Sequence, residues 1–327
     1  MNRAALLTVL LLVTGLTVPG AAFATPKVHV DRNQVTVSGI SAGAQMAHQL
    51  HIAFPEIFSG AGIIAGAPYG CAAGSLGVAM TRCMGKVDTV LPIGEFVETI
   101  RSAEKEGQVG ETSLLGDDPV WIFHGSLDQT VAVELSDATM ALYGEFLPSG
   151  NIRYVKDIAA AHTFPTRSSG IACDTSESPF IGNCSFDAAG ELLQHLYDGL
   201  DAPTGKIQSG LTETKLPGGV AAGLNDTAYL YIPAACTTGE QSCKAHLVLH
   251  GCAQSSAELG TDFIEQSGYL PWAAANNIVL AFPQVSPAPA NPFSCWDWWG
   301  YTGTSYPGRE GKQMKVLGDW MIGLSGQ

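Results

Sequence analysis

The sequence predicts an α/β fold in which helices cover both faces of a mostly parallel central sheet. A β-branched run at residues 35–37 leads through a serine between two glycines into a helical stretch. Later, short apolar runs alternate with helical or turn-rich stretches. Strands that alternate with helices form parallel sheets, because each helix returns the chain to the same edge. The composition, 46% hydrophobic and 14% charged, supports a large core.

The N-terminus predicts export. Arg3 is followed by an apolar run at residues 4–16 and by Ala-Phe-Ala at residues 22–24. A basic start, an apolar stretch and an A-x-A site are typical of a secretory signal peptide, so we expect residues 1–24 to be removed and the protein to be secreted. A membrane anchor is the alternative, because the uncharged run is long enough to span a bilayer. Residues 25–327 contain no linker or repeat and are expected to form a single domain.

The stretch Gly39-Ile40-Ser41-Ala42-Gly43 follows the G-x-S-x-G pattern of a tight strand-to-helix turn. Met46, Leu50 and Phe54 recur at spacing four, which predicts an amphipathic helix after the turn. Such a turn lifts the serine Oγ clear of the sheet, and the helix N-terminus supplies N–H groups to a developing oxyanion. The five residues alone also fit an ordinary glycine-rich turn. The strand and helix around them favour a catalytic serine.

Histidine spacing and net charge bear on which ligands are expected. His48 and His51 have a spacing that suits metal ligands, but they stand alone on the helical stretch. We therefore expect them on a solvated helix face and expect no metal site. The net charge of −14 argues against nucleic acid or an anionic membrane as a partner.

Asp128 and His162 are the predicted partners of the serine. The apolar run at residues 119–123 predicts a strand, and the turn after it presents Asp128, whereas Asp117 and Asp118 precede that strand. A strand at residues 152–155 and a helical stretch at 157–160 lead to His162 in a loop of small residues. The other histidines lie in helical, N-terminal or strand contexts that suit structural roles. The order Ser, Asp, His is the one that α/β-hydrolases use.

The C-terminal third contains the strands that an α/β-hydrolase needs before its serine. Runs at residues 228–233, 245–252 and 278–284 predict strands, and residues 311–324 predict a helix. The second run ends in His250-Gly251-Cys252, the type of sequence that supplies an oxyanion donor. We therefore predict a circularly permuted α/β-hydrolase fold. Its oxyanion hole would consist of the backbone N–H groups of Ala42 and Cys252.

Eight cysteines in an exported chain are expected to be paired. Nearest-neighbour pairing gives disulfides Cys71–Cys83, Cys173–Cys184, Cys236–Cys243 and Cys252–Cys295. Spacing does not exclude the other connectivities. The last pair would connect the predicted oxyanion loop to a tryptophan-rich loop.

The chain resembles the circularly permuted, single-domain extracellular polyhydroxybutyrate (PHB) depolymerases, within a wider group of secreted esterases. The resemblance covers nearly all of the mature chain, through "SGISAGAQMA", "AFPEIFSGAGIIAGAPYGCA", "FHGSLDQTV", "AAHTFPT", "LVLHGCAQS" and "NPFSCWDWWG". One departure is Ala42-Gly43-Ala44, where relatives often have Ser-Gly-Gly or Ala-Gly-Gly. The Ala44 methyl group leaves slightly less space at the start of the helix than a glycine would. The predicted catalytic residues are the same.

The resemblance implies a serine esterase that hydrolyses a polyester chain or hydroxyacyl oligomers through an acyl-enzyme. We expect it to act as a monomer and to need no metal or cofactor. It also implies a cleft for several hydroxyacyl units. Trp296, Trp299 and Tyr301 are the expected substrate contacts, although three tryptophans within four residues also fit a cap on the core.

Three alternatives remain beside this interpretation. The chain could be a related secreted carboxylesterase that acts on feruloyl or acetyl groups or on oxidised polyvinyl alcohol. It could be a binding protein with an inactive hydrolase fold, against which the intact Ser41, Asp128 and His162 argue. A cysteine nucleophile is disfavoured, because paired cysteines have no thiolate.

Overall fold

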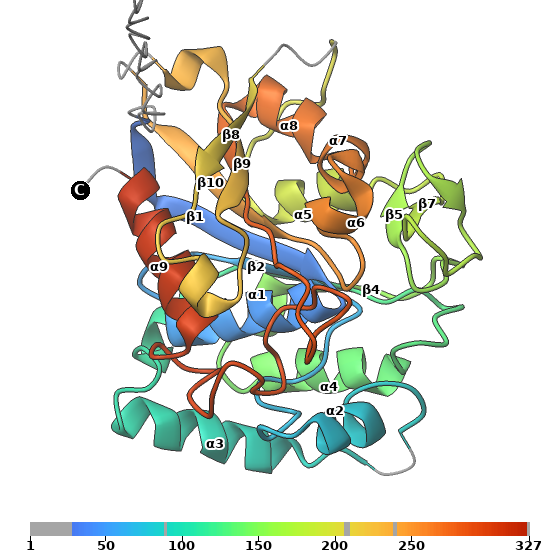
Figure 1. Cartoon of the computed structure of the whole chain (residues 1–327), viewed down its shortest axis with the longest axis vertical. Coiled ribbons are helices and arrows are strands. Elements are labelled where there is room, and N and C mark those ends of the chain that lie inside the picture. Colours follow the sequence, from blue (N-terminus) through green and yellow to red (C-terminus); the bar gives the residue numbers. More distant parts are fainter. Residues whose placement is uncertain (1–27, 88–89, 206–209, 238–240, 326–327) are drawn as a thin grey trace, which may run out of the picture.

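The computed structural model describes residues 28–87, 90–205, 210–237 and 241–325, so the predicted signal peptide lies outside the described residues. An eight-stranded sheet forms the centre of the molecule (Figure 1). Its strands, in spatial order, are β4 (Ile152–Val155), β3 (Val120–Phe123), β2 (Ala61–Ile64), β1 (Val30–Ile40), β10 (Cys243–Leu249), β11 (Ile278–Phe282), β9 (Thr227–Tyr231) and β8 (Leu211–Lys215). The pairs from β4 to β11 are parallel, whereas β9 is antiparallel to both of its neighbours.

Helices cover both faces of this sheet, as the sequence predicts (Figure 1). One layer of the core contains side chains of α1 (Ala42–Ala53), α3 (Ile93–Lys105), α4 (Val133–Tyr143) and α9 (Lys312–Leu324). The other layer contains side chains of α5 (Ala188–Leu196), α7 (Asp262–Gln266) and α8 (Tyr269–Asn276). The remaining elements are α2 (Leu76–Arg82), α6 (Ser256–Leu259), a small sheet of β5 (Phe164–Thr166), β7 (Ile181–Asn183) and β6 (Ile171–Ala172), and 3₁₀ turns at Thr112–Asp117, Ser149–Asn151, Val220–Ala222 and Ala234–Cys236.

β1 lies between β2 and β10, so the first strand and a strand from the C-terminal third are neighbours in the middle of the sheet. Val37 pairs with Ala61 on one side and with Leu247 on the other. From Val35 to Ile40 the strand is buried without interruption, as expected for a parallel strand covered on both faces. The C-terminal strands therefore lie beside the serine strand. That this order arose by circular permutation remains an interpretation.

Three local predictions were wrong. α1 is not amphipathic: every residue from Ala42 to Ala53 is buried, because the helix packs between the sheet and other helices. His48 and His51 are consequently not solvated. His51 interacts with the Tyr143 hydroxyl at 2.9 Å and with Asp118 Oδ2 at 3.1 Å, and burial lowers the pKa of His48 to about 3. Residues 157–160 form an irregular loop rather than a helix.

The disulfide prediction is confirmed. Cys71–Cys83, Cys173–Cys184, Cys236–Cys243 and Cys252–Cys295 are all bonded, so no cysteine is free. Within the described residues, none of the helices combines the length and apolar character that crossing a membrane requires.

Candidate active site

Ser41 lies in the turn between β1 and α1 with a strained backbone. Its φ of 57° and ψ of −121° fall in a region that L-residues rarely occupy. The Ser41 N–H donates to the Ile64 carbonyl at 2.9 Å, which extends the β1–β2 pairing by one residue. α1 begins at the next residue, so the hydroxyl stands at the carboxyl end of the sheet beside a helix N-terminus. This is the geometry that the G-x-S-x-G pattern predicts.

Gly39 and Gly43 are required by close backbone approaches. A Cβ on Gly39 would lie 2.3 Å from the backbone of Gly43. A Cβ on Gly43 would lie 2.4 Å from the carbonyl oxygens of Leu249 and His250. Both distances are far below van der Waals contact, so neither position admits a side chain without displacing the backbone. The two glycines let β1, α1 and the end of β10 converge at Ser41.

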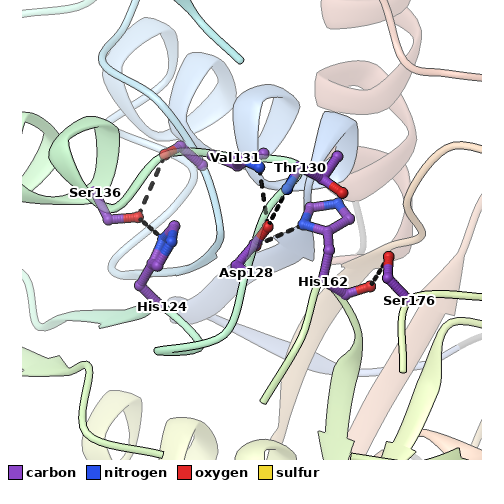
Figure 2. Close-up of polar contacts among 8 residues, drawn as sticks. His124, Asp128, Thr130, Val131, Ser136, His162 and Ser176 are labelled. Carbon is purple, nitrogen blue, oxygen red and sulfur yellow. Dashed lines mark hydrogen bonds and ion pairs between the residues drawn. The ribbon is translucent and has the colours of Figure 1, made fainter. Parts of the chain in front are cut away.

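Asp128 and His162 form a buried, hydrogen-bonded pair. His162 Nδ1 lies 2.7 Å from Asp128 Oδ2, and Figure 2 shows the ring and the carboxylate facing each other. The side chain of His162 is 9% exposed and that of Asp128 is 1% exposed. Asp128 Oδ1 accepts the N–H groups of Thr130 and Val131 at 2.8 and 2.9 Å. Burial by itself would raise the pKa of Asp128, but the hydrogen bonds from His162 and these amides outweigh it and hold the pKa below its ordinary value.

Ser41, Asp128 and His162 follow three parallel strands of one sheet. Ser41 comes directly after β1, Asp128 follows β3, and His162 follows β4. The carboxyl ends of parallel strands meet at one edge, where open α/β sheets place their ligands. In the described chain the His162–Asp128 hydrogen bond is formed, and the Ser41 hydroxyl makes none. Catalytic hydrogen bonds are often long without substrate and tighten when it binds.

A cavity of about 410 Å³ opens at Ser41. Ala42 and Cys252, the two predicted oxyanion donors, line it together with the serine. Ala42 is the first residue of α1, where backbone N–H groups have no partner inside the helix. Apart from Gln45 and Asn291, the remaining lining is apolar or disulfide-bonded: Ala65, Leu76, Met80, Cys83, Met84, Val131, Ala290, Pro292, Phe293, Cys295, Trp298 and Trp299.

The three aromatic residues predicted to contact substrate lie in different places relative to the cavity. Trp299 lines the cavity, and its contact with substrate stays a prediction. Trp296 does not: its side chain has no exposed surface, and its Nε1–H donates to the His250 carbonyl at 2.9 Å. Tyr301 packs behind Trp299 at a ring distance of 4.8 Å, and its hydroxyl donates to the Cys295 carbonyl at 2.9 Å. The prediction of direct contact therefore fails for Trp296, and Tyr301 supports the cavity wall.

Several cavity residues were missed by the sequence analysis. Trp298 was part of the noted cluster but was not chosen, and Phe293, Leu76 and Met80 carried no signal of their own. Phe293, Leu76 and Met80 are unusually exposed for large apolar residues, at 63%, 54% and 57%. Among the described residues, no cluster of three or more His, Cys, Asp or Glu side chains is arranged to hold a metal ion.

Known proteins provide a close comparison, although no family model matches the chain. The chain is 40% identical over 306 residues to a poly(3-hydroxybutyrate) depolymerase of Delftia acidovorans, which covers 91% of this chain and 60% of that protein. It is 35% identical over 316 residues to a polyhydroxybutyrate depolymerase of Talaromyces funiculosus, over 91% of each. The chain therefore spans about three fifths of the first relative and nearly all of the second.

Solved structures agree with these relatives. A PHB depolymerase with a serine-to-alanine substitution, complexed with an R3HB trimer, superposes with a TM-score of 0.86 at 32% identity. The PHB depolymerase from Penicillium funiculosum superposes with a TM-score of 0.85, also at 32% identity. Each comparison covers 92% of this chain and 98% of the solved chain.

Proposed function

This chain belongs to the polyhydroxybutyrate depolymerase family, and from that premise we propose that it hydrolyses the ester bonds of poly(3-hydroxybutyrate) or its oligomers. One observation carries the proposal. Ser41, on a strained turn, opens into the same apolar cavity as Ala42 and Cys252, at the sheet edge that also bears the His162–Asp128 pair. A related enzyme has been solved with an R3HB trimer.

The proposed reaction is acyl transfer in two halves. His162 Nε2 takes the Ser41 proton while Oγ bonds to the ester carbonyl carbon. The tetrahedral intermediate then breaks its C–O bond to the leaving alcohol, which receives that proton from His162. In the second half, His162 takes a proton from water while the water oxygen attacks the carbonyl carbon of the acyl-enzyme. The C–O bond to Ser41 then breaks, Oγ receives that proton from His162, and the acid is released. Asp128 accepts the Nδ1–H of His162, so it selects the tautomer and stabilises the imidazolium.

The negative oxygen of each tetrahedral intermediate requires donors beside Ser41. The backbone N–H groups of Ala42 and Cys252 are proposed for this role, because both residues line the cavity at the serine. A donor aimed at the developing oxyanion contributes about 3 kcal/mol of transition-state stabilisation. The chemistry then needs no group outside this chain and water.

The shape and lining of the cavity suit an apolar polyester. Trp298, Trp299 and Val131 offer apolar surface to a hydroxyacyl chain. Leu76, Met80 and Phe293 stand at the rim with more than half of their surface exposed. Apolar side chains gathered at the mouth of a site can adsorb to a water-insoluble polymer. We propose that the enzyme rests on polymer through this rim.

The proposal extends to the whole protein. Four disulfides support an oxidising compartment, and with the N-terminal pattern they support secretion after removal of residues 1–24. Residues 25–327 then act as a single catalytic domain. We propose that this domain works as a monomer.

Hydrolysis of a poly(3-hydroxybutyrate) film, followed by analysis of the soluble products, tests the function. The protein is expected to release 3-hydroxybutyrate or its short oligomers, whereas Ser41→Ala releases none and keeps the unfolding temperature. Ser102→Ala, an exposed serine on α3, is the matched control and should retain full activity. Faster turnover of feruloyl or acetyl esters than of hydroxybutyrate oligomers would assign the chain to another esterase specificity. Unchanged hydrolysis by Ser41→Ala would remove the serine from the mechanism.

A further inference from the structure

One wall of the cavity at Ser41 is formed by apolar side chains of α2 and of the residues just after it. Leu76 and Met80 are four residues apart and lie on one face of the helix, and Met84 follows at the same spacing just past its end. All three line the cavity. Met80 is 57% exposed, so the apolar wall contains an accessible thioether.

The other sulfur atoms of the described chain are less accessible or lie away from the cavity. All eight cysteines are in disulfides, so no thiol competes for an oxidant. Met46, Met314 and Met321 are no more than 1% exposed. Met140, on α4, is 38% exposed and does not line the cavity. Met80 and Met140 are therefore the two most exposed methionines among the described residues, and only Met80 belongs to the cavity.

A methionine thioether reacts directly with hydrogen peroxide. The sulfur lone pair attacks one peroxide oxygen and the O–O bond breaks. The hydroxide that leaves takes the proton from the transferred oxygen and becomes water. Sulfur is oxidised by two electrons, peroxide is reduced by two, and the product is methionine sulfoxide. Exposed methionines react most readily, and methionine sulfoxide reductases reverse the change.

The sulfoxide oxygen would lack a hydrogen-bond donor in the cavity wall. Apart from Gln45 and Asn291, the lining beyond Ser41 is apolar or disulfide-bonded. Asn291 Nδ2 already donates to the Cys295 carbonyl at 2.7 Å, and the Gln45 amide pairs with the backbone of Ala67. Polymer that covers an oxidised Met80 must therefore remove water from the S=O group without replacing its hydrogen bonds, which costs free energy.

We propose that Met80 is a peroxide-sensitive modification site, at which oxidation to the sulfoxide weakens the adsorption of the enzyme to polyester and leaves the chemistry at Ser41 intact. The proposal rests on the proposed function, since it assumes that this wall contacts polymer. It assigns the sensitivity to one of the two exposed methionines, so Met140 provides an internal control.

Peroxide treatment of the wild type, Met80→Leu and Met140→Leu tests the proposal. Leucine has nearly the volume of methionine and no sulfur to oxidise. Mass analysis of peptides locates the added oxygen, and film hydrolysis at low enzyme concentration reports adsorption. After treatment, the rate should fall about tenfold in the wild type and in Met140→Leu, because adsorption loses the apolar transfer free energy of one methionine side chain. Met80→Leu should stay within about twofold of its own rate before treatment.

Hydrolysis of p-nitrophenyl acetate separates adsorption from chemistry. This short, soluble ester reacts at Ser41 without adsorption to a surface. Its kcat/KM in the treated wild type should stay within about twofold of the untreated value, because a loss of transition-state stabilisation would lower that ratio. An equal loss on the film and on the soluble ester overturns the proposal.

Met80→Gln provides a second variant that needs no peroxide, because its amide places a polar group at the position of the sulfoxide. In the Ser41→Ala background, which leaves the polymer intact, it should adsorb to polymer granules about tenfold more weakly than Ser41→Ala alone. Unchanged adsorption overturns the proposal. So does equal peroxide sensitivity of Met80→Leu and the wild type, or a Met80 that stays reduced while Met140 is oxidised. An untreated wild type that releases no product from the film would instead refute the proposed function.

Discussion

Gly43 shows how tightly single residues constrain the site. It is the second residue of α1, and its Cα faces the carbonyl oxygens at the end of β10. A methyl group there would lie 2.4 Å from two of those oxygens, so either α1 or the His250-Gly251-Cys252 loop must move. Either movement changes the distance between Ser41 and the Cys252 amide.

We therefore predict that Gly43→Ala impairs both stability and catalysis. Overpacking of this kind costs about 1–3 kcal/mol of unfolding free energy. Misplacement of the donor should lower kcat about 10- to 100-fold. Urea unfolding and oligomer hydrolysis measure the two effects.

Gly94 provides the matched control for this substitution. It lies exposed near the start of α3, where an added Cβ meets nothing within 4 Å. Gly94→Ala should leave kcat unchanged and raise the free energy of unfolding by about 0.4–1 kcal/mol. Wild-type kcat in Gly43→Ala would show that the site tolerates this movement.

At the same scale, Ser41, Asp128 and His162 were predicted from their positions after strands, and the structure brings the side chains of His162 and Asp128 within 2.7 Å of each other. Their catalytic role stays a prediction. Which tryptophan faces the cavity could not be predicted. That choice depends on Asp297, whose carboxylate accepts the backbone N–H groups of Gly300, Tyr301 and Thr302 and folds the loop around itself. No periodicity encodes such a loop.

At the scale of single elements, α1 shows what a sequence pattern predicts and what it leaves out. The spacing of Met46 and Leu50 correctly predicts that α1 is a helix, and both are fully buried. Its polar residues are buried as well, because His51 finds partners in Tyr143 and Asp118 on other elements. A hydrophobic stripe identifies one buried face, and only tertiary contacts show that the other is buried too.

Two of the disulfides differ in the length of chain that they close and in their position relative to the cavity. Cys252–Cys295 joins cysteines that are 43 residues apart in the sequence, and both line the cavity. Cys236–Cys243 joins cysteines that are 7 residues apart, and neither lines the cavity. From loop entropy, replacing the first pair with serines should cost about 4 kcal/mol of unfolding free energy, and the second about 2 kcal/mol. Only the first replacement should also lower kcat/KM.

Urea unfolding and ester kinetics of the two double variants, Cys252→Ser/Cys295→Ser and Cys236→Ser/Cys243→Ser, check this prediction. Equal kinetic losses in both would mean that the disulfides act through global stability. Unchanged kcat/KM in the first would mean that the oxyanion loop holds its geometry without the bond.

For the whole molecule, buried histidines predict acid sensitivity. Burial lowers the pKa of His48 and His246 to about 3 and that of His250 to about 4. In the unfolded chain a histidine has a pKa of about 6.5. Between these values the unfolded chain binds more protons than the folded one, so stability falls as pH decreases. Once pH is well below 6.5, each histidine contributes a slope of about 1.4 kcal/mol per pH unit.

Urea unfolding at pH 7, 6 and 5 measures this slope. Carboxylates with lowered pKa values, such as Asp128, remain charged over this range and do not add to it. His48→Gln should make the slope shallower by about 1.4 kcal/mol per pH unit. An unfolding free energy that stays constant from pH 7 to 5 would contradict the prediction.

The positions of the large strands along the chain could also be predicted from the sequence, because apolar runs mark β1, β3, β10 and β11. β2 contains Gly62 and directly follows Gly60, and β8 is mostly polar and exposed, so neither stands out as a strand. The small sheet of β5, β6 and β7 consists of strands of two or three residues, held beside the Cys173–Cys184 disulfide. Such short strands form through their surroundings rather than through their own pattern.

The meeting of β1 and β10 also bears on how the molecule assembles. Thr36 interacts with His246, a partner 210 residues away, in the middle of the sheet. Closing so large a loop loses chain entropy before any contact compensates for it, and topologies dominated by such contacts fold slowly. The first strand has no central neighbour until the last third of the polypeptide reaches it. Before that contact forms, the apolar segments of both strands are exposed and prone to aggregation.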